Sequence, residues 1–200
     1  MSVAKKSLLL IFIVLLIDQV SKFYIKLNFR LGESIEVFSW FQIYFIENNG
    51  MAFGMEFIGK LFLTIFRIVA VAGLSYFLYH LIRKQARTGF ILSVSLLLAG
   101  AAGNIFDSVF YGVIFNESYG QLATLFPEGG GYAPLFYGKV VDMLYFPIIV
   151  NSAGETVFFS PVFNVADSAI SVSAAIILLF FRKDLNEHLE SKKEKEDANS

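Results

Sequence analysis

The sequence predicts a mainly α-helical membrane protein with four transmembrane helices and a small β-sheet cap on the extracytoplasmic side. Three observations support this fold class. Of the 200 residues, 56 % are hydrophobic and 16 % are charged, whereas soluble domains are about half apolar and about one quarter charged. The mean hydropathy is +0.63. The apolar residues form four long runs, and the segments between the runs are rich in β-branched and aromatic residues.

Each apolar run is long enough to cross a bilayer, because a hydrocarbon core of about 30 Å requires roughly 20 helical residues. Ten of the sixteen Lys and Arg residues lie before the first run, between the second and third, and after the fourth. The positive-inside rule places these charges, and hence both chain termini, in the cytoplasm. The first run starts like a signal peptide but lacks a small-residue cleavage site, so we interpret it as a retained anchor. The predicted spans are residues 8–27, 58–81, 90–111 and 162–181.

The two segments between spans on the other side, 28–57 and 112–161, are predicted to form the cap. The stretches IEVFSWFQIYFIE and GKVVDMLYFPIIV have the composition of β-strands. Trp40 and the neighbouring Phe and Tyr residues are typical of the headgroup layer of a membrane. A small sheet that rests on the membrane surface is therefore expected.

The remaining stretches complete the predicted organisation. The sequence between Tyr119 and Tyr137 contains three consecutive Gly and two Pro residues, which predicts a flexible loop. Residues 183–200 alternate in charge and are expected to form a cytoplasmic tail. Residues 1–182 are therefore predicted to form one membrane-embedded domain.

Polar side chains inside the spans are candidate functional residues, because a charged or amide group in a bilayer is costly. Asn104 and Asp107 in the third span, and Asn164 and Asp167 in the fourth, are each spaced i, i+3. Each pair therefore shares one helix face. Both pairs lie near the outer ends of their helices, and Asp142 lies in the segment that leads into the fourth span. These residues are expected to meet at one depth.

Other polar residues are predicted to support that cluster. Asn48 precedes Gly50, which permits a sharp turn and close backbone approach. Asp18 and Lys22 are spaced i, i+4 in the first span, and we interpret them as a structural ion pair. Arg67 lies near the middle of the second span, and its depth predicts a pairing with Asp18.

The absence of certain residues restricts the chemistry of this cluster. Cysteine is absent, which excludes thiol catalysis, disulfides and thiolate metal ligands. His80 and His188 are predicted to be cytoplasmic, so a Ser–His pair and a His-ligated metal are not expected at the outer site. Two carboxylates in a low-dielectric site cannot easily both ionise, so one keeps a proton and the pair can act as acid and base on one water. A Ser/Lys pair of Ser108 and Lys139, or purely structural pairing, are the alternatives.

Five motifs now indicate a family: DQVSK from Asp18, NNGMAFG from Asn48, GNIFD from Gly103, GKVVD from Gly138 and FNVAD from Phe163. Over nearly its whole length the chain resembles the lipoprotein signal peptidases, or type II signal peptidases. The resemblance implies an aspartyl endopeptidase of the bacterial inner membrane that removes signal peptides from prolipoproteins ahead of a diacylglyceryl-modified cysteine. It implies Asp142 and Asp167 as the catalytic pair. It further implies substrate-binding or supporting roles for Asn48, Gly50, Asn104, Asp107, Asn164, Asp18 and Lys22.

The resemblance and the predicted topology together set expectations about partners. Four spans with both termini inside place the active site on the periplasmic side. The expected partners are lipid-modified prolipoproteins and membrane lipid, with no nucleic acid, no cofactor and no metal, and the enzyme is expected to act as a monomer.

The sequence departs from the family pattern in two places. The family commonly has Arg directly after the Asp of its third-helix motif, whereas here Ser108 follows Asp107. Arg30 or Lys139 could supply the missing cation. The stretch 111–138 is also longer than in compact members.

The alternative function from a different class is an ion-coupled membrane carrier that uses intramembrane carboxylates. The clustering of the carboxylates at one depth argues against a path across the bilayer. The sequence also lacks the paired broken helices of inverted repeats.

Overall fold

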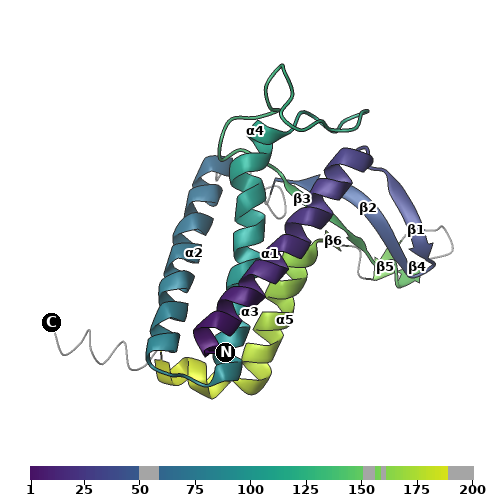
Figure 1. Ribbon diagram of the computed structural model, residues 1–200. Coiled ribbons are helices and arrows are strands. Elements are labelled where there is room, and N and C mark those ends of the chain that lie inside the picture. Colours follow the sequence, from purple (N-terminus) through teal and green to yellow (C-terminus); the bar gives the residue numbers. More distant parts are fainter. Residues whose placement is uncertain (50–58, 151–155, 159–160, 189–200) are drawn as a thin grey trace.

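Four long helices form the body of the protein in a computed structural model, which describes residues 1–49, 59–150, 156–158 and 161–188. The helices run side by side, and a sheet lies against one end of the bundle (Figure 1). We call this end the sheet end; the N-terminus lies at the opposite end (Figure 1). The long helices are α1 (Val3–Asn28), α2 (Lys60–Arg83), α3 (Thr88–Phe106) and α5 (Val165–Phe180).

Among the described residues, three helical segments are long and apolar enough to cross a membrane. They are α1, α2, and the segment Thr88–Ile114 that begins with α3. The shorter α5 provides a fourth span if it is taken together with Arg182–His188, to which it is joined at an angle of 87°. The mainly helical fold class with a small antiparallel sheet is therefore confirmed.

The central helix α3 contacts the other three helices of the bundle. Small residues permit this close approach. A Cβ atom on Gly103 would lie 2.6 Å from Oδ2 of Asp18 in α1. A Cβ atom on Gly100 would collide with the carbonyl of Ala166 in α5. Glycine at these two positions thus lets α1 and α5 lie directly against α3.

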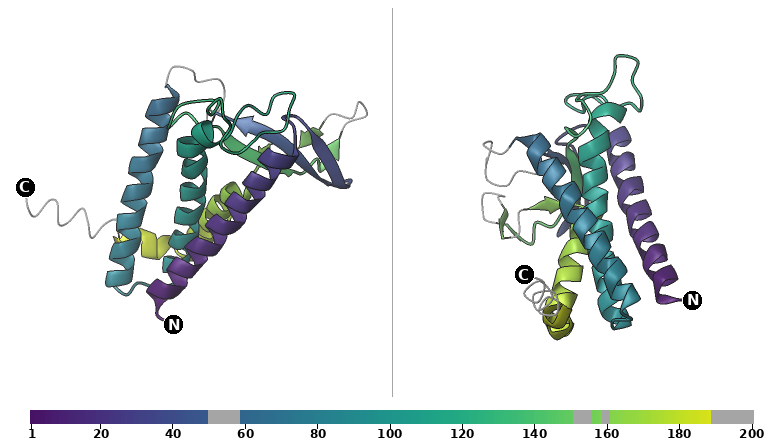
Figure 2. Two further views of the ribbon diagram at one scale, coloured as in Figure 1. Left: turned by 45° about the horizontal axis from the view of Figure 1, so that its top comes forward. Right: turned by 90° about the vertical axis from the view of Figure 1, so that its left-hand side faces the viewer.

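The sheet end of α3 changes its winding. A π-helical turn, η1 (Asp107–Tyr111), follows α3 and leads into the short α4 (Gly112–Ile114). The predicted flexible loop returns along these turns (Figure 2). Gly138 N donates to Ser108 O at 2.9 Å, and Phe136 N donates to Val109 O at 3.0 Å. The loop therefore satisfies carbonyl groups of the π-helical turn, and its backbone is packed onto the end of α3.

The main sheet has four antiparallel strands in the order β1-β2-β3-β6. In this sheet Ile46 lies opposite Asp142, and Leu144 lies opposite Phe163. The last strand runs directly into α5, so the sheet places the middle of β3 beside the first turn of that helix. The strands are β1 (Ser34–Phe38), β2 (Phe41–Asn48), β3 (Val140–Tyr145) and β6 (Val162–Phe163), while β4 (Ile149–Val150) pairs with β5 (Thr156–Phe158).

Stacked aromatic rings cover part of the sheet. Trp40 is 53 % exposed and stacks on Phe38, with ring centroids 5.4 Å apart, and on Phe146 at 6.1 Å. Phe146 also stacks on Phe41 at 4.9 Å and on Phe163 at 5.6 Å. These rings join β1, β2 and β6, and the place of Trp40 in the headgroup layer stays a prediction.

Several boundaries differ from the prediction, and α1 starts at Val3 instead of at residue 8. The fourth span was expected from residue 162, but residues 162 and 163 pair with β3, so the helix starts at Val165. The expected tail begins with the helical segment Arg182–His188, which turns across the end of the bundle. It is held there by the rings of Phe181 and His188, each with its centroid 6.0 Å from that of Phe90. The rest of the tail lies outside the described residues.

Candidate active site

Asp142 and Asp167 are held by the same asparagine. Asn164 is the N-cap of α5 and is fully buried. Its Nδ2 donates to Oδ1 of Asp142 at 2.7 Å, and its Oδ1 accepts from the backbone N of Asp167 at 2.8 Å. Oδ2 of Asp167 accepts from the backbone N of Asn164 at 3.3 Å, which completes a capping box. The first turn of α5 thus positions one aspartate and binds the other.

Asp142 lies on β3, and it is 2 % exposed. Its Oδ2 accepts from Nδ2 of Asn48 at 3.4 Å, so both carboxyl oxygens face amide donors. Burial, followed by the negative charge of Asp167, raises the pKa of Asp142 from 3.8 to about 7, although the two amide donors oppose this shift. Asp142 can therefore hold a proton near neutral pH.

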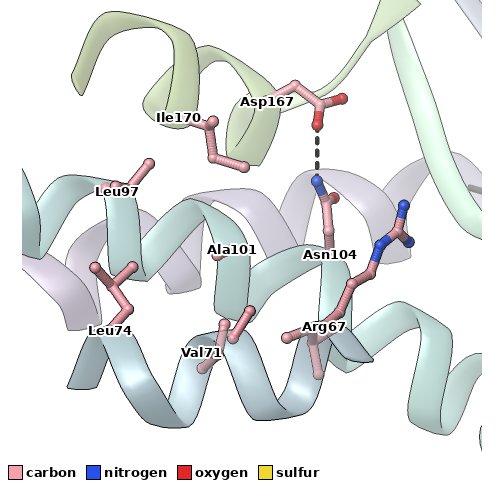
Figure 3. Close-up of a pocket in the computed structure, with 10 residues that line it drawn as sticks. Arg67, Val71, Leu74, Leu97, Ala101, Asn104, Asp167 and Ile170 are labelled. Carbon is pink, nitrogen blue, oxygen red and sulfur yellow. Dashed lines mark hydrogen bonds between the residues drawn. The ribbon is translucent and has the colours of Figure 1, made fainter. Parts of the chain in front are cut away.

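Asp167 is oriented from the neighbouring helix. Asn104 in α3 donates from Nδ2 to Oδ1 of Asp167 at 2.7 Å (Figure 3). The Oδ1 of Asn104 accepts from Lys22 at 2.9 Å and from Nδ2 of Asn164 at 3.1 Å. These bonds fix the Asn104 amide with its nitrogen toward Asp167.

A buried charge network of Asp18, Lys22 and Asp107 lies next to Asn104 and Asn164. The Nζ of Lys22 lies 2.9 Å from Oδ2 of Asp18 and 2.8 Å from Oδ2 of Asp107, and all three side chains are at most 1 % exposed. Asp18 Oδ1 accepts from Ala166 N at 2.9 Å, and Asp107 Oδ2 accepts from Val141 N at 3.2 Å. The network therefore ties α1 and α3 to the start of α5 and to β3.

The predicted Asp18–Lys22 pair is present, but it is part of a larger group. Asp107 is the second carboxylate on Lys22, and Gln19 was not predicted at all. Nε2 of Gln19 donates to both Asp18 and Asp107 at 3.0 Å. The signal for Gln19 was its place inside the DQVSK motif, directly after the aspartate.

Arg67 does not occupy its predicted place. The carboxylate of Asp18 is bonded to Lys22, Gln19 and the start of α5, whereas the charge that acts on Arg67 is that of Asp167. The pairing of Arg67 with Asp18 is therefore wrong. Its depth in the span was a usable signal, but depth alone could not say which neighbouring helix the side chain faces.

Ser108 and Lys139, the residues of the Ser/Lys alternative, have other partners and do not form a pair. Ser108 is buried, and its Oγ donates to Asn104 O at 3.0 Å within its own helix. Lys139 is bonded to Glu47 at 3.1 Å and to Glu117 at 3.5 Å. Lys139 is thus engaged elsewhere, and it does not replace the arginine of the family pattern. Gly50, expected beside Asn48, lies outside the described residues.

An apolar pocket of about 390 Å³ opens beside the polar cluster, between α2, α3 and α5 (Figure 3). Arg67, Asn104 and Asp167 form its polar end. The other lining residues are Ala70, Val71, Leu74, Leu97, Ala101, Ile105 and Ile170.

A second buried ion pair lies near the sheet, apart from the two aspartates. Lys26 at the end of α1 binds Glu47 of β2 at 2.6 Å and Ser118 of the loop at 2.8 Å. The rings of Phe115 and Tyr132 lie 5.3 and 5.1 Å from its Nζ. Burial alone would raise the pKa of Glu47, but Lys26 and Lys139 outweigh burial and lower it.

Comparisons with known proteins identify the family. The family model described as signal peptidase (SPase) II matches residues 10–182. A lipoprotein signal peptidase of Porphyromonas gingivalis is 48 % identical over 92 % of this chain and 86 % of its own length. One from Amoebophilus asiaticus is 34 % identical over 86 % and 75 %. A solved bacterial membrane enzyme superposes with a TM-score of 0.63 at 27 % identity, covering 92 % of this chain and 91 % of its own. The chain belongs to the signal peptidase II family.

Proposed function

We infer that this protein is a lipoprotein signal peptidase that removes signal peptides from prolipoproteins, and we propose that Asp142 and Asp167 are its catalytic pair. One observation carries the assignment of the pair. A single buried asparagine donates to both carboxyl groups, from Nδ2 to Asp142 and from its backbone N to Asp167, and the pKa of Asp142 is raised to about 7. A pair with one proton near neutral pH is what acid–base catalysis of hydrolysis requires.

The proposed reaction uses one water between the carboxyl groups. The ionised aspartate takes a proton from the water as its oxygen attacks the scissile carbonyl carbon. The protonated aspartate donates a hydrogen bond to the oxygen that becomes negative. When the carbon–nitrogen bond breaks, the nitrogen leaves as an amine that receives a proton from the pair. Asn104 and Asn164 hold both carboxyl groups in place throughout.

The pocket supports a substrate with an apolar segment. Most of its lining is aliphatic, and its polar end carries Asp167. A signal peptide could lie along this wall with its cleavage site at the aspartates. We propose that the bond cleaved precedes a cysteine modified with diacylglycerol, whose acyl chains remain in the adjacent leaflet.

The charge distribution supports an orientation in the bacterial inner membrane. The start of α1, which carries Lys5 and Lys6, the α2–α3 turn, and the start of the Arg182–His188 helix lie at the end of the bundle opposite the sheet end (Figure 1). The positive-inside rule places this end in the cytoplasm and the aspartates toward the periplasm. We propose that a monomer suffices, because Asp142, Asp167 and the side chains that hold them come from one chain.

The alternative of an ion-coupled carrier is not supported, since the relatives are named as peptidases. The Ser/Lys alternative lacks a contact between Ser108 and Lys139 among the described hydrogen bonds and ion pairs.

The test is cleavage of a diacylglyceryl-modified prolipoprotein by the purified enzyme in detergent with EDTA. We expect cleavage by the wild type, and we expect Asp142→Asn and Asp167→Asn to abolish it. Asp184→Asn is the matched control, because Asp184 lies at the opposite end, bonded to Arg87 at 3.1 Å. Near-normal cleavage by either dyad variant, or loss of wild-type cleavage in EDTA, would refute the proposed pair.

A further inference from the structure

One face of α2 carries two cations toward the polar cluster. Lys60, Thr64 and Arg67 are spaced i, i+4 and i+7, so they share a helix face. Thr64 is 1 % exposed, and its Oγ1 donates to Phe136 O at 3.0 Å. Lys60 donates to Asn49 O at 2.8 Å. These two contacts fix the rotation of α2, and Arg67 therefore points into the pocket (Figure 3).

The two aspartates face different charges. From α2, Arg67 lines the same end of the pocket as Asp167, and from α3 the amide of Asn104 donates to Asp167 (Figure 3). From β3 it faces Asp142, and from its own helix it faces the backbone N of Asn164.

Asp142 has a different set of neighbours. Amides of Asn164 and Asn48 donate to it, Asp167 repels its charge, and Lys22 attracts it. Arg67 lines the pocket together with Asp167 and not with Asp142, so this cation lies on the side of Asp167.

We propose that Arg67 is a positioning residue that keeps Asp167 ionised in the resting enzyme, so that Asp167 is the base and Asp142 is the acid. This inference rests on the proposed catalytic pair. Asp167 takes the proton of the attacking water, whose oxygen forms the new bond to the carbonyl carbon. The proton of Asp142 supports the carbonyl oxygen. After the carbon–nitrogen bond breaks, the proton held by Asp167 passes to the leaving amine.

Arginine suits this position better than lysine would. Its guanidinium stays charged even when it is partly removed from water, whereas a lysine amine loses its proton more easily in an apolar pocket. The aliphatic lining of the pocket makes this difference relevant, because Arg67 shares that lining with Val71 and Leu74.

The test is the pH dependence of single-turnover cleavage of the lipidated precursor between pH 4.5 and 8.5. The activity should rise with pH as the base ionises and fall as the acid loses its proton. In Arg67→Gln we expect the rising limb to move up by about one pH unit, because a nearby positive charge that favours the carboxylate is gone. Relative to the wild type, the cleavage rate of Arg67→Gln should fall about tenfold at pH values on the acid side of the rising limb, and by less near pH 7.

Two further variants make the result specific. Arg67→Lys should restore the position of the rising limb at low pH, where the lysine is charged. Arg83→Gln, at the other end of the same helix, should leave the profile unchanged. Arg67→Met replaces Arg67→Gln if the latter does not fold, since Met suits the aliphatic lining.

A neutral variant whose profile superimposes on the wild type after scaling would overturn the proposal, because a purely structural role lowers activity at every pH alike. The proposed catalytic pair would survive that result as long as Asp142→Asn and Asp167→Asn remain inactive. If those variants are active, the pair itself fails.

Discussion

Replacing Asn164 separates its role as a helix cap from its role as a donor to Asp142. Asn164→Ser keeps a side-chain oxygen for the backbone N of Asp167 but loses the Nδ2 donor, which bonds Asp142 at 2.7 Å, Asn104 at 3.1 Å and Val141 O at 3.2 Å. Asn164→Ala loses both functions.

The expected losses of stability in these two variants follow from the buried contacts that each variant removes. A lost N-cap costs about 1 kcal/mol, and leaving buried acceptors without this donor costs about 2 kcal/mol. We expect the melting temperature in detergent to fall by about 6 °C in Asn164→Ser and by about 9 °C in Asn164→Ala, at roughly 3 °C per kcal/mol.

The same substitution should change the pH dependence of cleavage. The Asn164 donor favours the ionised form of Asp142, so its loss raises the pKa of Asp142 further above its ordinary value. In Asn164→Ser the falling limb of the pH profile should therefore move to higher pH. Equal melting temperatures for the Ser and Ala variants, together with an unmoved falling limb, would refute the division of roles assigned to Asn164.

Three other predictions concern buried charges, each measured as thermal unfolding in detergent. Lys22→Met leaves two buried carboxylates without their cation and should lower the free energy of unfolding by about 3–5 kcal/mol. Lys5→Met, on the exposed part of the same helix, is the control and should change it by less than about 0.5 kcal/mol. Equal melting temperatures for these two variants would contradict the prediction. Because the pKa of Asp142 is raised to about 7, its contribution to stability is present at acid pH and is lost as the pH rises through about 7, so Asp142→Asn should melt higher than the wild type at pH 8 and not at pH 4. Because the pKa of Glu47 is lowered, the stability it contributes is present above its ordinary pKa and lost at acid pH, so Glu47→Gln should melt lower than the wild type at pH 7, with the gap closing toward pH 3; a gap that is constant with pH would count against this account.

The helices and the residues of the site could be predicted from the sequence because both follow from spacing along the chain. Apolar runs of span length predict α1, α2 and α3 directly. The i, i+3 pairs put Asn164 beside Asp167 on one helix, and the structure shows these residues in a single capping box.

Features that depend on contacts between distant segments could not be predicted. The π-helical turn at Asp107–Tyr111 is stabilised by amides of the returning loop, and the local sequence carries no signal for it. The start of α5 was misplaced because an apolar pair, residues 162 and 163, fits a strand as well as a helix. Arg67 was assigned to the wrong carboxylate because periodicity gives the depth of a side chain but not the helix that it faces.

The catalytic role of the two aspartates is the central claim, and binding measured beside turnover tests it most directly. Asp142→Asn and Asp167→Asn keep the size of the original side chains and one of the two acceptor oxygens of each. Both variants should therefore bind the diacylglyceryl-modified prolipoprotein as tightly as the wild type. Their single-turnover cleavage should fall by at least about a thousandfold, since the acid or the base is gone. Cleavage near the wild-type rate in either variant, or a loss of activity fully explained by weaker binding, would contradict the account.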